Sequence, residues 1–568
     1  MKYSVLADTY VRLEKVSSKL EKTRIVAELL KETHVEILSK VVLLLDGRVF
    51  PPWSGEELGV KDQLILRSIQ KAYGVKADDS VQAFKKTGDL GSATELFASS
   101  KKQVTLGKKE LSIDKVFSNL QDLAKQTGEG SQERKLSLIA ELLSQAQPIE
   151  ARYIIRTILY NLRVGVAEGL IRDAIVNAFL LKDGTTKEDK AKLTEIVEYA
   201  LNILSDFGEV AKIAKEKGIE GLRKVRPELG KPIQVMLAEK AESIEEPFEE
   251  FKTVIIETKY DGARIQCHKK GDKIWLYTRR LENVTNQFPD LVELCKKGLK
   301  AGNYIIEGEV LAINPKTGRP MPFQRLSQRI HRKYDIEKMI KEIPIQMNIF
   351  DVLYLDGKIQ FDKPLKERRK ILEKIVKKIP EKFQLAKKII TDDPKKAEEF
   401  YQMSLKSGQE GIMIKVVDSP YVFGRHVGGW YKIKPIMETL DLVVVGATWG
   451  EGKRSKWLSS YMLACRDPDT GKFLRCGMMS TGLTEKEYDM ITKTLKPLIV
   501  KEIGKDVVLK PKIVVETGYQ EIQKSTNYES GFALRFPRLV RIRDDRGPDD
   551  ADTIERLAKL YESQGREG

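Results

Sequence analysis

The spacing of apolar residues changes twice along this chain of 568 residues, and these changes limit the folds it can adopt. A chain of this length exceeds what one hydrophobic core usually organises, so about three domains are expected. In residues 1–225, apolar side chains recur at positions i, i+3, i+4 and i+7, as at Leu136, Ile139, Ala140 and Leu143. That spacing gives each helix one apolar face, so this region is predicted to be an all-α domain.

Short strand patterns replace the helical spacing in residues 226–435. Runs at 253–259, 263–269 and 273–278 are typical of strands, and helical patterns lie irregularly among them. An irregular mixture favours an α+β fold over a regular βαβ repeat. Residues 226–435 are therefore predicted to form an α+β domain.

Residues 436–568 are mostly of β character. Gly- and Asp-rich turns separate their apolar runs, as in a small β-barrel of the oligonucleotide-binding (OB-fold) type. The predicted strands lie at residues 440–447, 459–465, 473–478, 507–509 and 513–518. A closing helix is expected at residues 553–562, with Asp552 and Glu555 as its capping box.

The chain carries a formal charge of +16 at pH 7 and a pI near 9.2. Such an excess suits a polyanionic partner, although a basic protein without a nucleic acid partner has the same composition. Basic residues also recur along the helical region, where they either bind DNA or form solvent-exposed helix faces. They are Lys101, Lys102, Lys108, Lys109, Arg134, Lys135, Arg152, Arg156 and Arg163. The loop at residues 127–131 either offers backbone N–H groups to a phosphate or is a plain turn.

Cysteine use and the N-terminus bear on the compartment. The cysteines are scattered without a CxxC pair, which argues against a structural zinc site and a disulfide framework. The start MKYSVLADTYVRLEKVSSKLEK lacks the apolar core of a signal peptide, and no run approaches the roughly 20 apolar residues of a membrane span. A soluble, cytoplasmic protein without a membrane segment is expected.

The strongest local signal is the octapeptide ETKYDGAR at residues 257–264. It places Lys259 at the end of an apolar strand, before a tight turn and another strand. A simple interpretation is an Asp-Gly hairpin with a solvent-exposed lysine. Further motifs that follow in order along the chain argue against that interpretation.

Together these motifs resemble the nucleotidyltransferase superfamily of DNA ligases, RNA ligases and mRNA capping enzymes. They are Lys259-Tyr260-Asp261-Gly262 (KxDG), Thr278-Arg279-Arg280, Glu307-Gly308-Glu309, Phe350-Asp351, EGIMIK at residues 410–415, WYKIK at 430–434 and RIRDDR at 541–546. The last motif is usually written RxDK, and Arg546 stands where that pattern has lysine. This exchange keeps the charge and changes the geometry.

The flanking segments narrow the resemblance. Residues 126–179 resemble the helical DNA-binding domain of archaeal and eukaryotic replicative ligases, and RFPR at 535–538 is similar to those enzymes too. The chain is thus identified as a member of the ATP-dependent DNA ligases of the archaeal/eukaryotic replicative type. The resemblance implies a helical DNA-binding domain, an adenylation domain and an OB-fold domain, which seal nicks in duplex DNA during replication, repair and recombination.

The resemblance also implies the chemistry. The amine of Lys259 attacks the α-phosphorus of ATP, giving a lysyl-AMP, and the nucleotide then passes to the 5′-phosphate of a nick. Glu309 and Glu410 are hard oxygen ligands for Mg²⁺, with Mn²⁺ as a substitute. The alternative for both carboxylates is an ion pair with Arg or Lys.

The remaining motif residues are expected to bind the nucleotide. Phe350 stacks on adenine in this interpretation, although a lone Phe in an apolar run is usually core, and Glu257 reads the exocyclic amine. Glu307 is either scaffold or site. The other expected nucleotide-binding residues are Arg264, Arg279, Glu309, Lys415, Lys432 and Lys434, with Arg543, Asp545 and Arg546 acting on the β- and γ-phosphates in the first step only.

The expected partner is nicked double-stranded DNA, held by all three domains of a monomer. Residues 435–441 are the candidate hinge that lets the barrel swing. Gln103-Val104-Thr105-Leu106 is the candidate for docking on a PCNA-type sliding clamp. ADP and GTP stay open as nucleotides, and a capping enzyme, an RNA ligase and a DNA-binding scaffold without catalysis stay open as alternative functions. The lack of a zinc-ligand cysteine cluster disfavours an NAD-dependent ligase.

Overall fold

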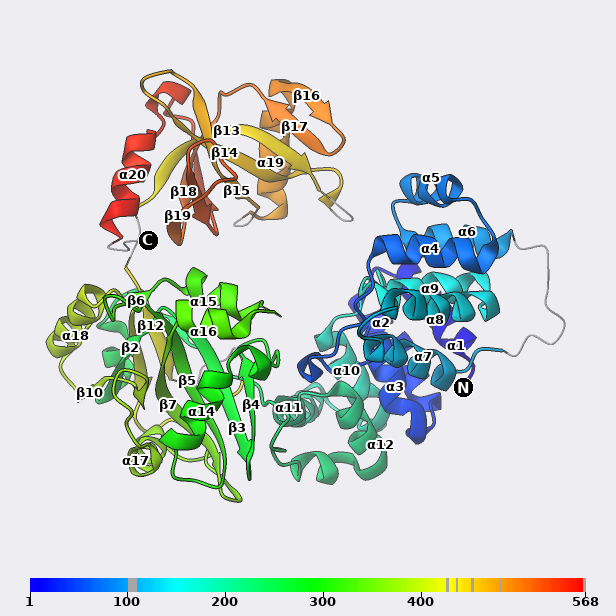
Figure 1. The fold of residues 1–568 in the computed structure, drawn as a ribbon, viewed down its shortest axis with the longest axis horizontal. Coiled ribbons are helices and arrows are strands. Elements are labelled where there is room, and N and C mark those ends of the chain that lie inside the picture. Colours follow the sequence, from blue (N-terminus) through cyan, green and yellow to red (C-terminus); the bar gives the residue numbers. More distant parts are fainter. Residues whose placement is uncertain are drawn as a thin grey trace.

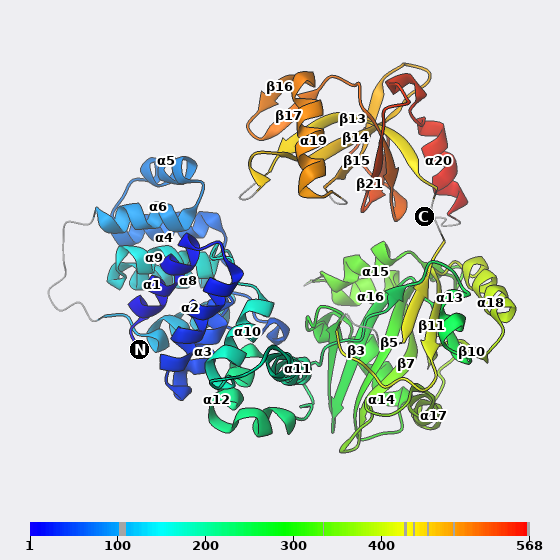
Figure 2. The same cartoon turned by 180° about the vertical axis from the view of Figure 1, so that it is seen from behind.

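The computed structural model describes residues 1–568 apart from 101–109, 333, 425–428, 436–437, 451–453, 481–482 and 565–568. Its three regions form an open C, in which the middle region adjoins both the helical N-terminal region and the strand-rich C-terminal region (Figures 1 and 2). In the described part of the chain, no helix combines the length and apolar character needed to cross a membrane.

Helices form the described N-terminal region, as the spacing of apolar residues predicts. Leu136, Ile139 and Leu143 on α8 are buried, and Ile139 and Leu143 contribute to one continuous core with the neighbouring helices. The helices are α1 (Tyr3–Lys15), α2 (Lys19–Glu32), α3 (Val35–Leu45), α4 (Asp62–Tyr73), α5 (Ala77–Thr87), α6 (Leu90–Ser99), α7 (Ile113–Lys125), α8 (Ser131–Gln145), α9 (Pro148–Ile158), α10 (Glu168–Phe179), α11 (Lys187–Leu204) and α12 (Phe207–Arg223).

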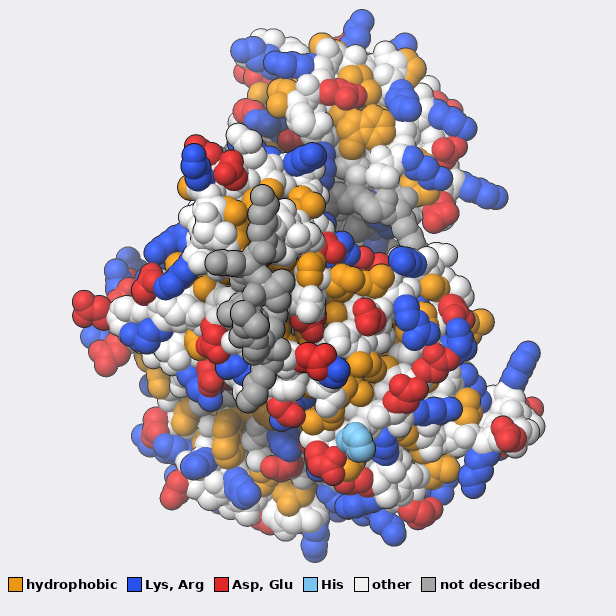
Figure 3. Space-filling view, turned by 90° about the vertical axis from the view of Figure 1, so that its right-hand side faces the viewer, with side chains coloured by type: hydrophobic (Ala, Val, Ile, Leu, Met, Phe, Trp, Pro, Cys, Tyr) orange, Lys and Arg blue, Asp and Glu red, His pale blue; other side chains and the backbone are white. Residues whose placement is uncertain are grey.

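Two of the basic residues considered for DNA binding are structural. Lys135 is buried and its Nζ donates to the carbonyl of Leu58 at 2.7 Å, and Arg156 is buried in an ion pair with Asp89 at 2.8 Å. A DNA-gripping role is therefore wrong for Lys135 and Arg156, because their charges are satisfied inside the helical region. On the face seen in Figure 3, Lys and Arg side chains are interspersed with Asp and Glu, which is typical of a solvated exterior.

The loop at residues 127–131 is a turn closed by a side chain. Gly128 and Gly130 both have φ of 73°, in the left-handed region that glycine adopts without strain. Arg134 of α8 donates to the carbonyl oxygens of Thr127 and Glu129, each at 2.9 Å. These contacts favour the plain-turn interpretation. The residues from Lys101 to Lys109, which include the candidate clamp-docking segment, lie outside the described residues.

The middle region has two sheets, which confirms the α+β prediction. One has the strand order β1-β12-β11-β2-β10, and the other runs β4-β3-β5-β7-β8, with β6 beside β5 and β9 beside β7. The strands are β1 (Glu239–Lys240), β2 (Val254–Lys259), β3 (Ala263–Lys270), β4 (Lys273–Thr278), β5 (Asn303–Ile313), β6 (Pro320–Met321), β7 (Ile345–Leu355), β8 (Lys358–Ile359), β9 (Phe383–Leu385), β10 (Lys388–Thr391), β11 (Gly411–Val416) and β12 (Trp430–Ile433). The helices are α13 (Glu246–Glu250), α14 (Pro289–Gly298), α15 (Phe323–Ile330), α16 (Ile336–Glu342), α17 (Leu365–Ile375) and α18 (Pro394–Lys406).

The strands on either side of the KxDG motif belong to different sheets. β2 pairs with β10 and β11, whereas β3 pairs with β4 and β5. The Asp-Gly hairpin considered for residues 257–264 is therefore wrong. Lys259 instead ends one sheet at the point where the chain crosses to the other.

The C-terminal region is rich in strands, as predicted. Its main sheet follows the order β15-β14-β13-β17-β16, and β18 pairs with both β13 and β21. The strands are β13 (Leu440–Trp449), β14 (Leu458–Arg466), β15 (Phe473–Met479), β16 (Ile499–Ile503), β17 (Asp506–Leu509), β18 (Val514–Gly518), β19 (Glu521–Lys524), β20 (Phe532–Arg535) and β21 (Arg538–Arg543).

Two helices accompany these strands. The apolar spacing of the C-terminal region did not predict α19 (Glu485–Leu495), and α20 (Ile554–Ser563) starts at a different cap from the expected one. The side chain of Thr553 accepts the N-terminal hydrogen bond from Arg556 N, so the capping box of Asp552 and Glu555 is wrong. Thr553 is the N-cap because its hydroxyl directly precedes the first helical residue.

The buried side chain of His268 connects the segment after α12 to the middle region through hydrogen bonds. Gly230 N donates to Nδ1 of His268 at 3.3 Å, and Nε2 lies 2.8 Å from the side-chain oxygen of Gln266, which also accepts from Ile233 N. These contacts fit the neutral ring with its proton on Nε2. Burial lowers the pKa of His268 to about 3.

Acid should destabilise the protein through this residue. An unfolded histidine titrates near about pH 6.5, so below that pH the unfolded chain takes up a proton that the folded chain refuses, down to about pH 3. Between about pH 6.5 and 5, urea titrations followed by tryptophan fluorescence should show the wild type losing about 2 kcal/mol more unfolding free energy than His268→Gln. Equal losses in the two proteins would exclude His268 as the cause.

Candidate active site

Three adjacent strands bring a lysine, a glutamate and a second lysine together. Lys259 ends β2, Glu410 directly precedes β11, and Lys434 directly follows β12. Pairing of β2 with β11 and of β11 with β12 puts these positions at the same sheet edge. There the amine of Lys259 forms an ion pair with Glu410, whose Oε2 also lies 2.6 Å from Nζ of Lys434.

The charges in this cluster shift its titration. Burial alone would raise the pKa of Glu410, but Lys259 and Lys434 lower that pKa to about 2, so the carboxylate is ionised. Burial, together with the charge on Lys259, lowers the pKa values of Lys432 and Lys434. The outcome is a concentration of cations around one anion, which suits the binding of phosphates.

Glu309 approaches Lys259 from the other sheet. It lies on β5 opposite Arg264, and among the described residues none donates a hydrogen bond to its carboxylate. Burial raises the pKa of Glu309 to about 7, while Lys259 and Arg264 act in the opposite direction. Of the two carboxylates, Glu410 therefore forms the ion pair with lysine that was considered as an alternative to metal binding, and Glu309 does not.

Two carboxylates beside a lysine amine fit a hard divalent cation. Within the described residues, no group of three or more His, Cys, Asp or Glu side chains is arranged to hold a metal ion. Glu309 and Glu410 would thus be the protein's share of the ligands, with water and phosphate oxygens as the rest. Mg²⁺ commonly binds in this way, through one or two carboxylates and the phosphates of a substrate.

A compact group of aromatic and charged side chains lies behind the lysine. Phe350 on β7 meets Trp430 on β12 edge to face, with ring centroids 6.0 Å apart. Nζ of Lys415 lies 4.0 Å from the Trp430 centroid and 4.6 Å from that of Phe350, and it forms a 2.6 Å ion pair with Glu257. Phe350 is itself buried, so the core interpretation holds for part of its ring.

Arg264 is tied into the same group. It donates to Glu307 Oε2 at 2.6 Å, to the hydroxyl of Tyr421 at 2.9 Å and to the carbonyl of Met236 at 2.6 Å. Glu307 is fully buried and also accepts from Tyr421, so its carboxylate is scaffold for Arg264. Trp430 and Tyr421 were not predicted to belong to the site from the sequence, although Trp430 is the first residue of the WYKIK motif.

Other expected site residues lie elsewhere. Arg279 lines a cleft between the helical and middle regions. Its positive charge still helps to lower the pKa of Lys432. Arg543 and Arg546 bind Asp441 within the C-terminal region, at 2.9 and 2.5 Å, and Asp545 pairs with Arg543. The last motif is therefore not assembled with Lys259 in this conformation. The candidate hinge at residues 435–441 falls partly outside the described residues.

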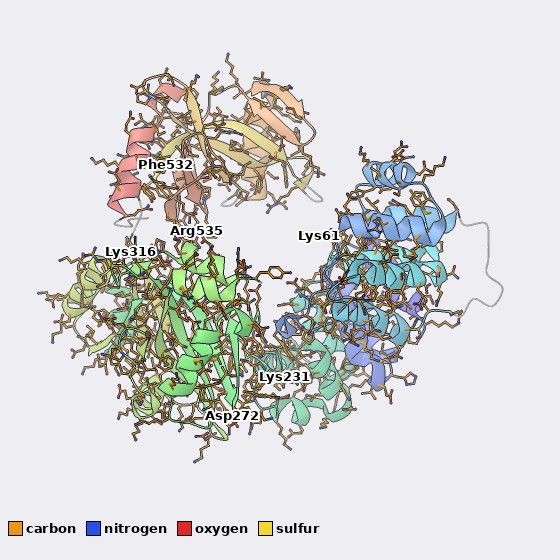
Figure 4. The ribbon with its side chains drawn as sticks, viewed as in Figure 1. Lys61, Lys231, Asp272, Lys316, Phe532 and Arg535 are labelled. Carbon is orange, nitrogen blue, oxygen red and sulfur yellow. The ribbon has the colours of Figure 1, made fainter. Side chains whose placement is uncertain are left out.

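The C-terminal region nevertheless touches the middle region near α15. Figure 4 shows Arg535 at the edge of the C-terminal region nearest the middle region, and its guanidinium lies 5.7 Å from the ring centroid of Phe323. Gln324 donates a hydrogen bond to Glu521 across the same boundary. Lys61, on the helical region, faces the other two regions in this view.

The turn that carries Lys259 has no room for a side chain at Gly262. A Cβ there would lie 2.4 Å from the carbonyl oxygen of Val310 and 2.9 Å from Leu311. Gly262→Ala should therefore force β3 away from β5, at a cost of about 1–3 kcal/mol, and sharply slow formation of any lysyl-nucleotide. The matched control is Gly271→Ala, which meets open space and adds only the local strain of its φ of 57°. Equal effects of the two changes on adenylation would contradict this account.

Comparisons with known proteins match this chain along its whole length. Three family descriptions match in order: "DNA ligase N terminus" at residues 2–176, "ATP dependent DNA ligase domain" at 235–434 and "ATP dependent DNA ligase C terminal region" at 454–546. The DNA ligase of Nanoarchaeum equitans is 47% identical over 99% of this chain and 99% of its own length. That of Thermococcus onnurineus is 47% identical over 100% and 99%.

A solved structure gives a likeness of fold alone. The structure titled "Pmar-Lig_Pre." covers 95% of this chain and 99% of its own, with a TM-score of 0.57 and 16% identity. The sequence matches run from end to end and include both the lysine cluster and the helical region. This chain accordingly belongs to the ATP-dependent DNA ligase family, beside its archaeal members.

Proposed function

We propose that the enzyme seals single-strand nicks in duplex DNA through a lysyl-AMP on Lys259. The observation that carries the proposal is the position of this lysine, paired with Glu410 at a sheet edge, on the strand that also carries Glu257. AMP then passes to the 5′-phosphate of the nick, and the adjacent 3′-hydroxyl displaces AMP to form the phosphodiester. Residues 1–225 would bind DNA, 226–435 would adenylate, and 436–568 would act as an OB-fold domain.

The resting ion pair has a consequence for the first step. An amine attacks phosphorus only when neutral, so the pair between Lys259 and Glu410 must open before lysyl-AMP can form. Lys432 and Lys434 would then hold the phosphates that enter this cluster. Glu309 and Glu410 would hold Mg²⁺, with Mn²⁺ as a substitute, and the ion would neutralise charge on the phosphates.

The side chains grouped around Glu257 and Phe350 suit a nucleoside. Phe350 offers a ring face for the base, and Arg264 a charge for the ribose or phosphate, together with Lys415. Glu257 is an acceptor in a buried setting, which suits the exocyclic amine of adenine and favours ATP over GTP. ADP shares this base, so only contacts with the γ-phosphate of ATP would distinguish the two nucleotides.

The C-terminal region would change position between steps. In the first step Arg543, Asp545 and Arg546 would meet the β- and γ-phosphates, with residues 435–441 as the hinge. In the later steps all three regions of one monomer would close around the duplex. Contacts with the backbone of DNA give little sequence preference and a steep dependence on salt. Lys61 of the helical region would contribute to such contacts, and Arg279 would hold the ribose or a phosphate of the nucleotide.

The test is direct. The protein is incubated with α-labelled ATP and Mg²⁺, the adduct is mapped by mass spectrometry, and nicked DNA is then supplied. We expect AMP on Lys259 and its transfer to the 5′-phosphate. Adduct formation with GTP alone, or joining of RNA but not DNA, would favour a capping enzyme or an RNA ligase. No covalent adduct at all would leave a DNA-binding scaffold.

Docking on a PCNA-type sliding clamp is a separate proposal that rests on residues 103–106. A pull-down with purified clamp should weaken for Gln103→Ala. Unchanged retention would remove this segment as the docking site.

A further inference from the structure

Arg369 lies in the core beside Glu257 and Phe350, outside the motifs that mark the site. It is on α17 and is 1% exposed. Its guanidinium donates to three main-chain carbonyls, those of Ile349 at 3.2 Å, Phe350 at 3.3 Å and Ala386 at 3.1 Å. Burying a guanidinium is costly, and an apolar side chain would fill the same volume without that cost. The buried charge of Arg369 therefore indicates a role besides filling the core.

This role involves the carboxylate of Glu257, which Arg369 contacts. Nη1 of Arg369 lies 3.4 Å from Oε1 of Glu257, and Nζ of Lys415 lies 2.6 Å from Oε2. The two cations thus hold the carboxylate from opposite oxygens. Arg369 also fixes the main chain of Phe350, so one side chain sets the position of both the acceptor and the ring.

One oxygen of this carboxylate is left without a hydrogen bond. Glu257 is 2% exposed, and its Oε1 is buried without a hydrogen-bond donor in the described residues. A buried acceptor in that state is unfavourable until a donor arrives. The 3.4 Å contact with Arg369 orients Oε1 without satisfying it, so a ligand N–H remains the missing partner.

The neighbouring arginine provides the contrast. Arg368 is fully buried as well, and it forms a two-point ion pair with Asp351 at 2.7 and 3.0 Å. Its Nη1 donates to the carbonyls of Lys363 and Ser419. Asp351 and the two carbonyls together hold Arg368, so Arg368 belongs to the scaffold.

We propose that Arg369 is a positioning residue that sets the base specificity of adenylation. It orients Oε1 of Glu257 to accept the hydrogen bond of the amino group at position 6 of the purine. Guanine presents a carbonyl oxygen at that position, which faces the carboxylate with like polarity. This inference rests on the proposed function and adds to it the residue that enforces the choice of adenine.

The experiment compares nucleotides that differ at position 6. Lysyl-nucleotide formation is measured with ATP, with purine riboside triphosphate, which lacks the amino group, and with GTP. The proteins are wild type, Arg369→Met, Arg369→Lys and the matched control Arg368→Met, each checked for folding by its melting temperature. The readout is the ratio of kcat/KM for ATP to that for purine riboside triphosphate.

We expect the wild type to prefer ATP by about 10–100-fold, the worth of one hydrogen bond to a charged acceptor. In Arg369→Met the ratio should fall toward unity, with GTP gaining relative to ATP, and Arg369→Lys should give an intermediate ratio. Arg368→Met should lower all rates equally and keep the ratio. A purely structural role for Arg369 predicts that same constant ratio.

A wild-type ratio in Arg369→Met would overturn the proposal. Should that variant fail to fold, an unchanged ratio in Arg369→Lys would do the same. A wild type that forms no lysyl-nucleotide with any of the three compounds would instead refute the proposed function. The two failures are thus distinguishable.

Discussion

Lys259→Ala should abolish nick sealing, lowering adenylation and overall ligation by more than about 10⁴-fold, because no other group can take the place of the attacking amine. The measurement is transfer of label from ATP to protein, followed by joining of nicked DNA. Sealing of a nick that already carries 5′-AMP should survive within about tenfold, since Lys259 is not a nucleophile in that step.

The control for this variant is Lys259→Arg. Arginine keeps a cation beside Glu410 and so keeps the ion pair, but a guanidinium is not a nucleophile at working pH. Both variants should therefore be equally inactive in the first step. Adenylation by Lys259→Arg at a rate near that of the wild type would show that the covalent bond forms elsewhere.

Arg543→Ala should separate the first step from the last. If the C-terminal region delivers this guanidinium to the leaving phosphates, its loss should lower adenylation by about 10²–10³-fold, as removal of one transition-state donor does. Sealing of pre-adenylated nicks should change only a few-fold. Rapid-quench assays of the two reactions give the two rates separately.

Arg541→Ala is the matched control. Arg541 lies on the same strand, is half exposed and pairs with Glu516 at 2.7 Å, without contact with Asp441. Its loss should leave both reactions close to wild type. A similar fall in both reactions for Arg543→Ala would mean that its pair with Asp441 serves the fold of the C-terminal region.

Much of the fold follows from local patterns. The apolar spacing predicted the helices of the N-terminal region, and the alternating runs predicted β2, β3 and β4 to within a residue. Those runs could not show that β2 and β3 enter different sheets, because sheet membership depends on pairing with strands far along the chain. The hairpin interpretation failed for that reason.

Charge was harder to interpret than apolar spacing. Lys135 and Arg156 look like members of a basic helix face, yet the fold supplies partners for them from distant segments. Arg369 shows the reverse case. Between motifs it resembles any helix arginine, and only burial beside Glu257 singles it out. The motif order predicted Lys259 and Glu410 as site residues, but it could not predict the ion pair between them.

The crossing of the chain from one sheet of the middle region to the other affects how ligands change its melting temperature. Glu309 is on β5 of one sheet, and Glu410 precedes β11 of the other, so a ligand that contacts both carboxylates would bridge the seam. Nucleotide and metal together would then act as a removable crosslink inside the middle region. Its melting temperature should rise more with both present than the sum of the rises with either one alone.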